Sequence, residues 1–314
     1  MIDSFTHFRV RIATGVASIL VGATALICGS VCGQEIEPRS YTNAPVGMNF
    51  LILGYADSEG GVSFDPSVPL TNANMKTELA ALAYARVFEL GGQSAKFDVV
   101  VPYARLNGTA EYKGSPVERD VSGFGDPRVR LSMNFYGAPA LSVRDFANYR
   151  QDLIIGGSVQ VSVPVGQYDP DRLVNIGTNR WFVKPELGVS KAWGPWTLEL
   201  TAAATVFGDN DDFFGGKHRK QDPIYTLQGH LVYGFSSGVW AALTAANLSG
   251  GRTTLDGVRG NDLQKSSRVG LTLAFPVNRY NSIKLYANNG LYIRTGTDFD
   301  TIGIAWQHRW GEGF

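Results

Sequence analysis

The chain ends with TIGIAWQHRWGEGF, residues 301–314, in which two kinds of side chain alternate. The even positions carry the apolar and aromatic set: Ile302, Ile304, Trp306 and Trp310. The odd positions carry the small and polar set: Gly303, Ala305, Gln307 and Arg309. Period-two alternation is typical of a β-strand with one face in an apolar environment. We therefore expect the chain to finish on such a strand. The rest of the sequence is needed to identify the apolar environment.

The same alternation recurs upstream in segments of about ten residues, separated by clusters of Gly, Asn, Asp and Pro. In residues 225–233, for example, Thr226, Gln228 and His230 alternate with Tyr225, Leu227 and Leu231. The pattern predicts twelve strands, which are expected near residues 45–55, 75–90, 96–106, 124–136, 152–165, 179–192, 196–208, 223–235, 239–248, 265–276, 282–294 and 299–310.

The connections between these segments alternate between long, polar loops and short turns. Long stretches such as 107–123, 209–222 and 249–264 alternate with short ones such as Gly194–Pro195, and residues 137–150 are an exception because they are longer than a turn. This alternation is typical of an antiparallel up-and-down transmembrane β-barrel, whose long loops face outside and whose short turns face the periplasm. We expect an all-β fold of about 12 strands.

A soluble β-sandwich also has alternating strands, but three features favour the membrane barrel. The strands are longer than the usual five or six residues. The polar faces are regular and of mixed charge, as a lumen lining requires. Aromatic residues recur near strand ends, where a membrane-interface girdle would lie: Trp181, Trp193, Trp196, Tyr233, Phe235, Trp240 and Trp310.

Composition and the N-terminus agree with an exported protein. The 314-residue chain has a formal net charge of zero, which argues against a nucleic-acid partner. Residues 1–33 have the order of a secretory signal peptide: Arg9 and Arg11, an apolar run over 12–28, then small residues up to Gly33. A single membrane-spanning helix is the alternative, but the run is slightly short. The expected parts are thus a signal peptide at 1–33, an N-terminal segment at 34–44 and an outer-membrane barrel at 45–314.

The expected inward faces carry a set of polar and charged residues that we take as candidates for the lumen lining. They are Arg128, Arg130, Lys184, Glu186, Glu199, Gln228, His230, Arg268, Lys284 and Arg309. They could form a constriction that filters solutes or ion pairs that stiffen the barrel, and the sequence leaves both open. Other inward positions are small, including Gly156, Gly188, Ser190 and Gly303, which favours an open pore. Whether residues 34–44 form a plug is also left open.

No catalytic, metal-binding or cofactor-binding constellation is recognisable, so we expect neither an enzyme nor a cofactor. The only cysteines, Cys28 and Cys32, precede the expected cleavage site. In the outer loops, the basic run Lys217, His218, Arg219 and Lys220 could contact lipopolysaccharide phosphates or could be a solvated loop.

Six stretches of the sequence, in order, resemble a family of bacterial outer-membrane proteins labelled as transporters of the meta-pathway of phenol degradation. They are APVGMNFLILGY (44–55), GFGDPRVRLSMNFYGAPAL (123–141), NIGTNRWFVKPELGVSKAWGPWTLEL (175–200), QDPIYTLQGHLVYGF (221–235), RVGLTLAFPVNRYNSIKLYANNG (268–290) and RTGTDFDTIGIAWQHRW (294–310). The family name implies uptake of aromatic compounds. Outer-membrane barrels also tend to end on a lipid-facing aromatic residue that the barrel assembly machinery reads. Trp306, Trp310 and Phe314 resemble this signal, although Glu312 interrupts the apolar set.

These observations predict a channel or transporter in the bacterial outer membrane for passive uptake of small, hydrophobic or aromatic solutes. Its expected partners are outer-membrane lipid, lipopolysaccharide, the barrel assembly machinery and the solute. The alternative is a structural or surface-interaction barrel without an open pore.

Overall fold

The computed structural model describes residues 37–63, 70–112, 114–294 and 296–311. The predicted signal peptide at 1–33 and Phe314 lie outside these residues, so both remain predictions. Within the described residues, no helix is both long enough and apolar enough to cross a membrane.

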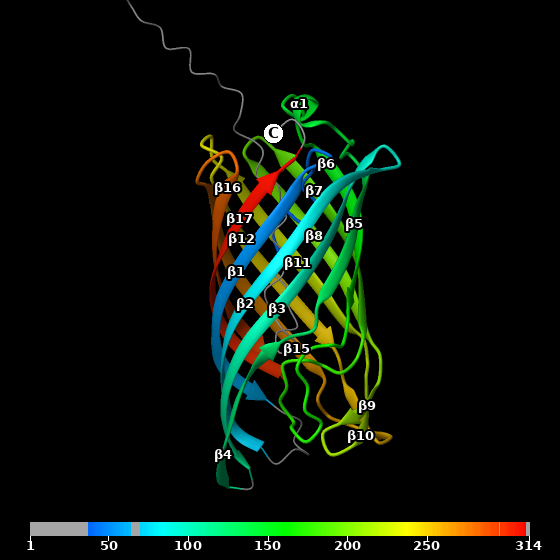
Figure 1. Cartoon of the computed structure of the whole chain (residues 1–314), viewed down its shortest axis with the longest axis vertical. Coiled ribbons are helices and arrows are strands. Elements are labelled where there is room, and N and C mark those ends of the chain that lie inside the picture. The colour runs from blue at the N-terminus through cyan, green and yellow to red at the C-terminus, as the bar shows by residue number, and fades with distance from the viewer. Residues whose placement is uncertain (1–36, 64–69, 113, 295, 312–314) are drawn as a thin grey trace, which may run out of the picture.

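A closed antiparallel barrel forms the body of the protein (Figure 1). Its twelve strands are β1 (Asn49–Ser63), β2 (Leu70–Leu90), β3 (Gln93–Tyr112), β5 (Arg128–Tyr136), β6 (Leu153–Ser162), β7 (Phe182–Trp193), β8 (Trp196–Phe207), β11 (Ile224–Gly234), β12 (Trp240–Gly250), β15 (Gln264–Pro276), β16 (Asn281–Ile293) and β17 (Gly296–Trp310). Each strand pairs with the next along the chain, β17 pairs with β1, and β3 pairs with β5. Closure leaves no unpaired strand edge, which a bilayer requires. The predicted barrel and strand number are confirmed.

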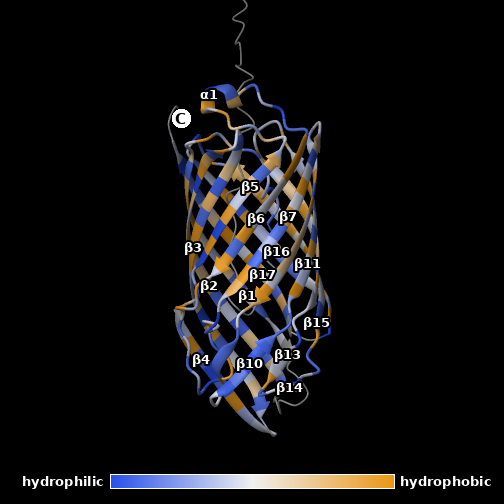
Figure 2. Ribbon diagram, turned by 90° about the vertical axis from the view of Figure 1, so that its right-hand side faces the viewer, coloured by the Kyte–Doolittle hydropathy of each residue, from blue (hydrophilic) through white to orange (hydrophobic). Residues whose placement is uncertain are grey.

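The two faces of the wall differ in the way the alternation predicts. Along β11, Tyr225 and Leu227 are exposed on the outside, whereas Thr226, Gln228 and His230 are buried on the inside. Figure 2 shows this alternation of hydrophobic and hydrophilic residues along the strands. Along β11, an apolar outer face thus backs a polar inner face, as expected for a strand between lipid and a lumen. The inner face of β1 and β2 is instead apolar, with Phe50, Ile52 and Ala83 buried there.

The long loops contain more regular structure than expected. Strand β4 (Ser115–Phe124) pairs with the outer half of β3. A separate four-stranded sheet joins β9 (Asn210–Phe213), β10 (Lys217–Gln221), β13 (Thr253–Leu255) and β14 (Val258–Arg259). The connections predicted to be long and polar at 107–123, 209–222 and 249–264 thus contain strands that the sequence analysis did not predict. Pairing of these segments into hairpins satisfies their backbone hydrogen bonds beyond the barrel rim.

The opposite end carries the short turns, as predicted, and the longer connection at 137–152. This connection contains the short helix α1 (Val143–Phe146), which lies over that end of the barrel (Figure 1). It also holds the chain that leads into β1, because Val46 donates a backbone hydrogen bond to Leu141. Residues before β1 therefore enter the barrel from the short-turn end, which we take as periplasmic.

Candidate functional site in the barrel lumen

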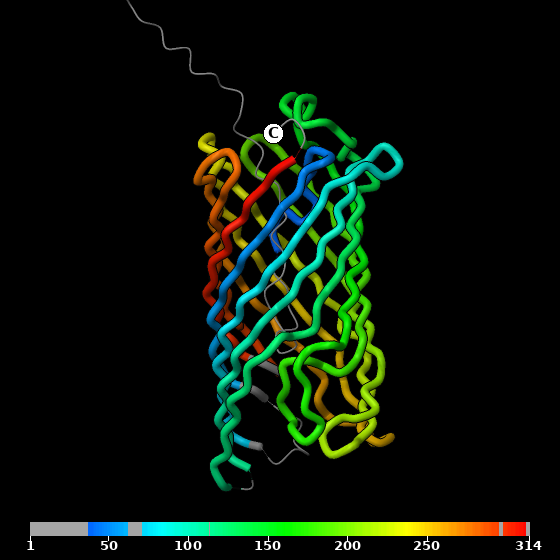
Figure 3. The backbone as a smooth tube through the Cα atoms, in the orientation of Figure 1, coloured from blue at the N-terminus to red at the C-terminus, as the bar shows by residue number. Residues whose placement is uncertain are grey.

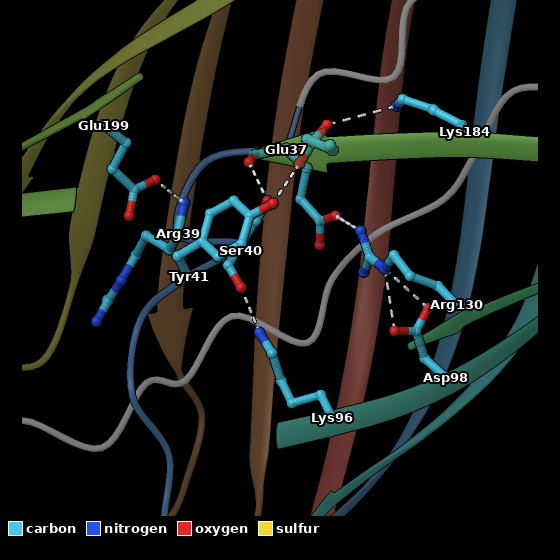
Figure 4. Close-up of polar contacts among 10 residues, drawn as sticks. Glu37, Arg39, Ser40, Tyr41, Lys96, Asp98, Arg130, Lys184 and Glu199 are labelled. Carbon is cyan, nitrogen blue, oxygen red and sulfur yellow. Dashed lines mark hydrogen bonds and ion pairs between the residues drawn. The ribbon is translucent and has the colours of Figure 1, made fainter. Parts of the chain in front are cut away.

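Residues 37–44, hereafter the plug, lie inside the barrel and bind its wall. Arg130 of β5 bridges two carboxylates, Glu37 of the plug and Asp98 of β3, at 3.0 Å each. The backbone N–H of Arg39 donates to Glu199 of β8. Figure 4 shows these contacts converging on the plug from several strands. The open question of the N-terminal segment is thus answered for residues 37–44: they occupy the lumen.

Two further contacts fix the middle of the plug. The ammonium group of Lys96 on β3 donates to the Ser40 carbonyl, and the Tyr41 hydroxyl donates to Glu186 of β7 over 3.0 Å. Glu186 also lies 3.7 Å from Lys184 on the same strand. The plug is held mainly by polar contacts to side chains of the wall, rather than by strand pairing.

The Tyr41 ring occupies space that glycine residues leave on the wall. A β-carbon added at Gly188 of β7 or at Gly156 of β6 would overlap this ring. Gly303 of β17 similarly leaves room for the ring of Tyr286 on β16. The argument that small inward residues leave an open pore was therefore wrong at these three positions, because aromatic rings fill the space. The residue pattern could not show this for Tyr41, which lies in a distant segment, whereas Tyr286 shares the inward parity of Lys284 and is the cross-strand partner of Gly303.

The structure places three of the ten lumen candidates against the plug, Arg130, Glu186 and Glu199, and a fourth, Lys184, pairs with Glu186. Gln228 and His230 lie on β11, the strand next to β8, where His230 is the cross-strand partner of Glu199, and both are buried. His230 Nδ1 lies 2.8 Å from the Thr244 hydroxyl of β12. The functional role of all these residues stays a prediction.

The other four candidates lie away from these plug contacts. Arg128 and Arg268 are buried inside the wall. The Lys284 ammonium lies over the Tyr286 ring, 5.7 Å from its centroid. Arg309 lies at the periplasmic rim, where its Nε donates to the Arg279 carbonyl in the turn before β16. Arg309 thus caps a turn.

The sequence analysis missed two inward residues of the wall: Lys96, which binds the plug, and Asp98, which pairs with Arg130. Lys96 and Asp98 alternate with Phe97 and Val99 on β3, so the period-two pattern could have identified them as inward. Trp240 was assigned to the aromatic girdle, and this was wrong. It is only 3% exposed and faces the lumen. Its parity with Ala242 and Thr244 on β12 was the available signal.

The outer half of the lumen is closed by loop 163–181, whose green tube in Figure 3 turns back at the lower end of the barrel. Ile176 of this loop packs against Ala56, Leu79 and Ala104 of three strands. The Asp126 carboxylate anchors the loop, because it accepts hydrogen bonds from the backbone N–H groups of Gly166 (2.9 Å) and Thr178 (2.8 Å) and from the Thr178 hydroxyl (2.6 Å). The lumen is therefore occupied from both ends.

Most of the basic run at 217–220 is engaged within the outer hairpins. Lys220 lies 3.3 Å from Asp209, and His218 lies within 2.6 Å of Asp211. The Arg219 guanidinium stacks over the Phe213 ring at 4.9 Å. These contacts satisfy much of the local charge, and binding of lipopolysaccharide stays a prediction.

The last strand presents its aromatic residues outward at the periplasmic rim. Trp306, His308 and Trp310 stack in succession, with ring centroids 5.9 and 5.7 Å apart. Tyr84 of β2 lies beside Trp310, 6.3 Å between centroids. This side of the rim thus has the aromatic girdle that a membrane interface favours.

Comparison with known families supplies the remaining evidence. A family model described as "Putative MetA-pathway of phenol degradation" matches residues 55–306. The chain belongs to this family. Comparison with curated proteins gives no match.

Among solved structures, an outer membrane channel from Pseudomonas putida F1 is similar over 88% of this chain and 100% of that chain, with a TM-score of 0.75 and 21% identity. The transport unit of the Escherichia coli autotransporter AIDA-I reaches a TM-score of 0.47 with 9% identity, over 85% and 91% of the two chains. A monoaromatic hydrocarbon channel, CymD, reaches 0.42 with 6% identity, over 86% and 90%. The first of these shows that the fold is that of an outer-membrane barrel, as predicted.

Proposed function

We propose that this protein is a narrow, passive outer-membrane channel for small, hydrophobic or aromatic solutes. The observation that carries the proposal is the kind of segment that occupies the lumen. Besides the side chains of the wall, two other segments occupy the lumen, the plug and loop 163–181, and hydrogen bonds and ion pairs join the plug to the wall. Such contacts are individually modest in a solvated site and can exchange with water. Membership of a family named for phenol degradation supports an aromatic solute.

The lumen also keeps some access beside the plug. Side chains of Arg130, Lys184 and Glu186 are 11–14% exposed although they lie inside the wall. Charged groups that line a narrow passage act strongly on passing charge. We therefore expect these residues to set ion selectivity. No energy-coupling motif is recognisable in the sequence, so passage would be diffusive.

A structural barrel without an open pore is the second candidate function. It is favoured by the double occupation of the lumen, by Tyr41 from one end and Ile176 from the other. Both candidate functions share the expected surroundings: outer-membrane lipid, lipopolysaccharide and the barrel assembly machinery. They differ in whether solute crosses.

Purified protein in planar bilayers, together with solute-loaded liposomes, separates the two candidates. The channel proposal expects measurable conductance and uptake of a small aromatic compound, with selectivity altered by Glu186→Lys. Arg268→Glu tests the same effect on β15, four strands from β7. A folded barrel that neither conducts nor takes up solute would support the structural function. Conductance with unaltered selectivity would keep the channel and remove these two residues from its filter.

A further inference from the structure

Arg39 has an unusual position within the plug. Its backbone is held by Glu199, but its side chain points away from that carboxylate, as Figure 4 shows. The guanidinium lies over the indole ring of Trp240, 5.4 Å from the ring centroid. Among the described residues, the guanidinium donates one long hydrogen bond, 3.5 Å from Nε to the Thr42 hydroxyl.

Glu199 is the negative charge nearby that acts on Arg39, but the guanidinium forms no salt bridge with it. Among the described residues, no carboxylate lies within ion-pair distance of its guanidinium. Arg130 and Lys184, by contrast, are both paired with carboxylates. A cation without a salt bridge in a half-buried site favours binding of an anion that reaches it.

The wall next to Arg39 adds two polar atoms that also lack partners. Trp240 Nε1 and His230 Nε2 are buried and make no hydrogen bond with the described residues. The two side chains are only 3% and 1% exposed, respectively, and both lie on the inner face of the β11–β12 hairpin. Between them on this face lie Val232 and Ala242, which form an apolar cluster with Trp240 and Ala274.

The geometry points to a subsite for an aromatic carboxylate at Arg39 and Trp240. The fork of guanidinium N–H groups matches the two oxygens of a carboxylate. The indole and its aliphatic neighbours offer an apolar surface for an aromatic ring. The indole N–H, which is a donor only, can bind a further oxygen of the solute. The Arg39 side chain is directed away from Glu199 (Figure 4), whose two oxygens accept hydrogen bonds from the Arg39 N–H and from Ser190.

This inference rests on the proposed function and makes it more specific. It assigns to the plug a role in solute binding besides closure, since Arg39 belongs to the plug and Trp240 to the wall. A solute that engages Arg39 would compete with the contact between the two.

Binding is testable without transport. We suggest titrating the micelle-solubilised, folded protein with benzoate, phenol and toluene while recording the indole N–H signals of its tryptophans by NMR. The Trp240 signal is assigned by its loss in Trp240→Phe. Benzoate is expected to move this signal saturably, with an affinity about tenfold or more above that for toluene, because only benzoate pairs with the guanidinium.

Arg39→Gln should remove most of the preference for benzoate and leave toluene unchanged. Arg279→Gln is the matched control, since Arg279 lies over the Tyr280 ring at 5.0 Å in a periplasmic turn and should leave benzoate binding unchanged. Equal benzoate affinity in Arg39→Gln and the parent protein would overturn the subsite. So would tighter binding of phenol or toluene than of benzoate.

The outcome for the subsite is separable from that for the channel. Conductance and uptake without benzoate binding at Trp240 would overturn the subsite and keep the channel. Benzoate binding in a barrel that neither conducts nor takes up solute would keep the subsite and overturn the channel.

Discussion

At the scale of single residues, the fit between the plug and the wall depends on the absence of side chains. Gly188 and Gly156 face inward on neighbouring strands, and the Tyr41 ring lies in the space they leave. A glycine on a strand face is often a place where another group approaches closely. Here the approaching group is a ring from a segment more than a hundred residues away.

Gly188→Ala should therefore displace Tyr41 and raise the conductance of the barrel. The added methyl group overlaps the ring, whose position is fixed by the hydrogen bond to Glu186. Single-channel recording in planar bilayers checks this expectation. Gly229→Ala on β11 is the matched control, because the closest atom to its added methyl group is at 3.4 Å. If both variants conduct like the parent protein, Tyr41 does not limit the current.

At the scale of strands, the direction of each side chain sets its cost of substitution. Leu187 lies on the outer face of β7 and is 65% exposed in the isolated chain. Ser190, which we expected to be a roomy inward position, is instead fully buried and bonded to both Glu199 and Gln151. Its small size reflects close packing.

Leu187→Arg should destabilise the folded barrel by about 2–4 kcal/mol if this position lies near the bilayer midplane. The cost is that of placing a guanidinium in hydrocarbon. Refolding into lipid vesicles as a function of denaturant concentration measures it, and Leu187→Ile is the apolar control. If Leu187→Arg lowers the free energy of unfolding by no more than Leu187→Ile does, this face of β7 does not face lipid.

At the scale of loops, Asp126 should decide whether loop 163–181 remains inside the outer mouth. Asp126→Ala removes three hydrogen bonds to the loop and leaves two backbone N–H groups without their partner. We expect faster amide hydrogen exchange at Gly166 and Thr178 and increased cleavage of the loop by added protease. Asp169→Ala, within the same loop, is the control for a general effect of removing a carboxylate. Unchanged exchange in Asp126→Ala would show that Ile176 and its apolar neighbours hold the loop without the carboxylate.

At the scale of the whole molecule, the plug closes a barrel that is complete without it. The barrel strands pair with one another and not with residues 37–41, so the ring of twelve strands should survive their removal. Deletion of residues 37–41 should raise conductance severalfold, as measured in planar bilayers. Asn43 to Val46 are retained because they bind the periplasmic connection at Pro139 and Leu141. Addition of a synthetic peptide spanning residues 34–44 should reduce the current again. A deletion variant that conducts like the parent protein would show that loop 163–181, rather than the plug, limits passage.

The sequence by itself determined the barrel. The period-two alternation, the twelve segments and the alternation of long and short connections are all local properties of the sequence. Together they predict a closed ring of strands that is surrounded by lipid. The inward direction of Lys184, Glu186, Glu199 and His230 followed from the same alternation. What fills the lumen was decided only by the tertiary structure. Glu37, Arg39 and Tyr41 lie in a segment without periodicity, and Ile176 lies in an irregular loop, so no local pattern marks them as inward. Their contacts join residues 93–160 positions apart, and such pairings arise from closure of the barrel around them.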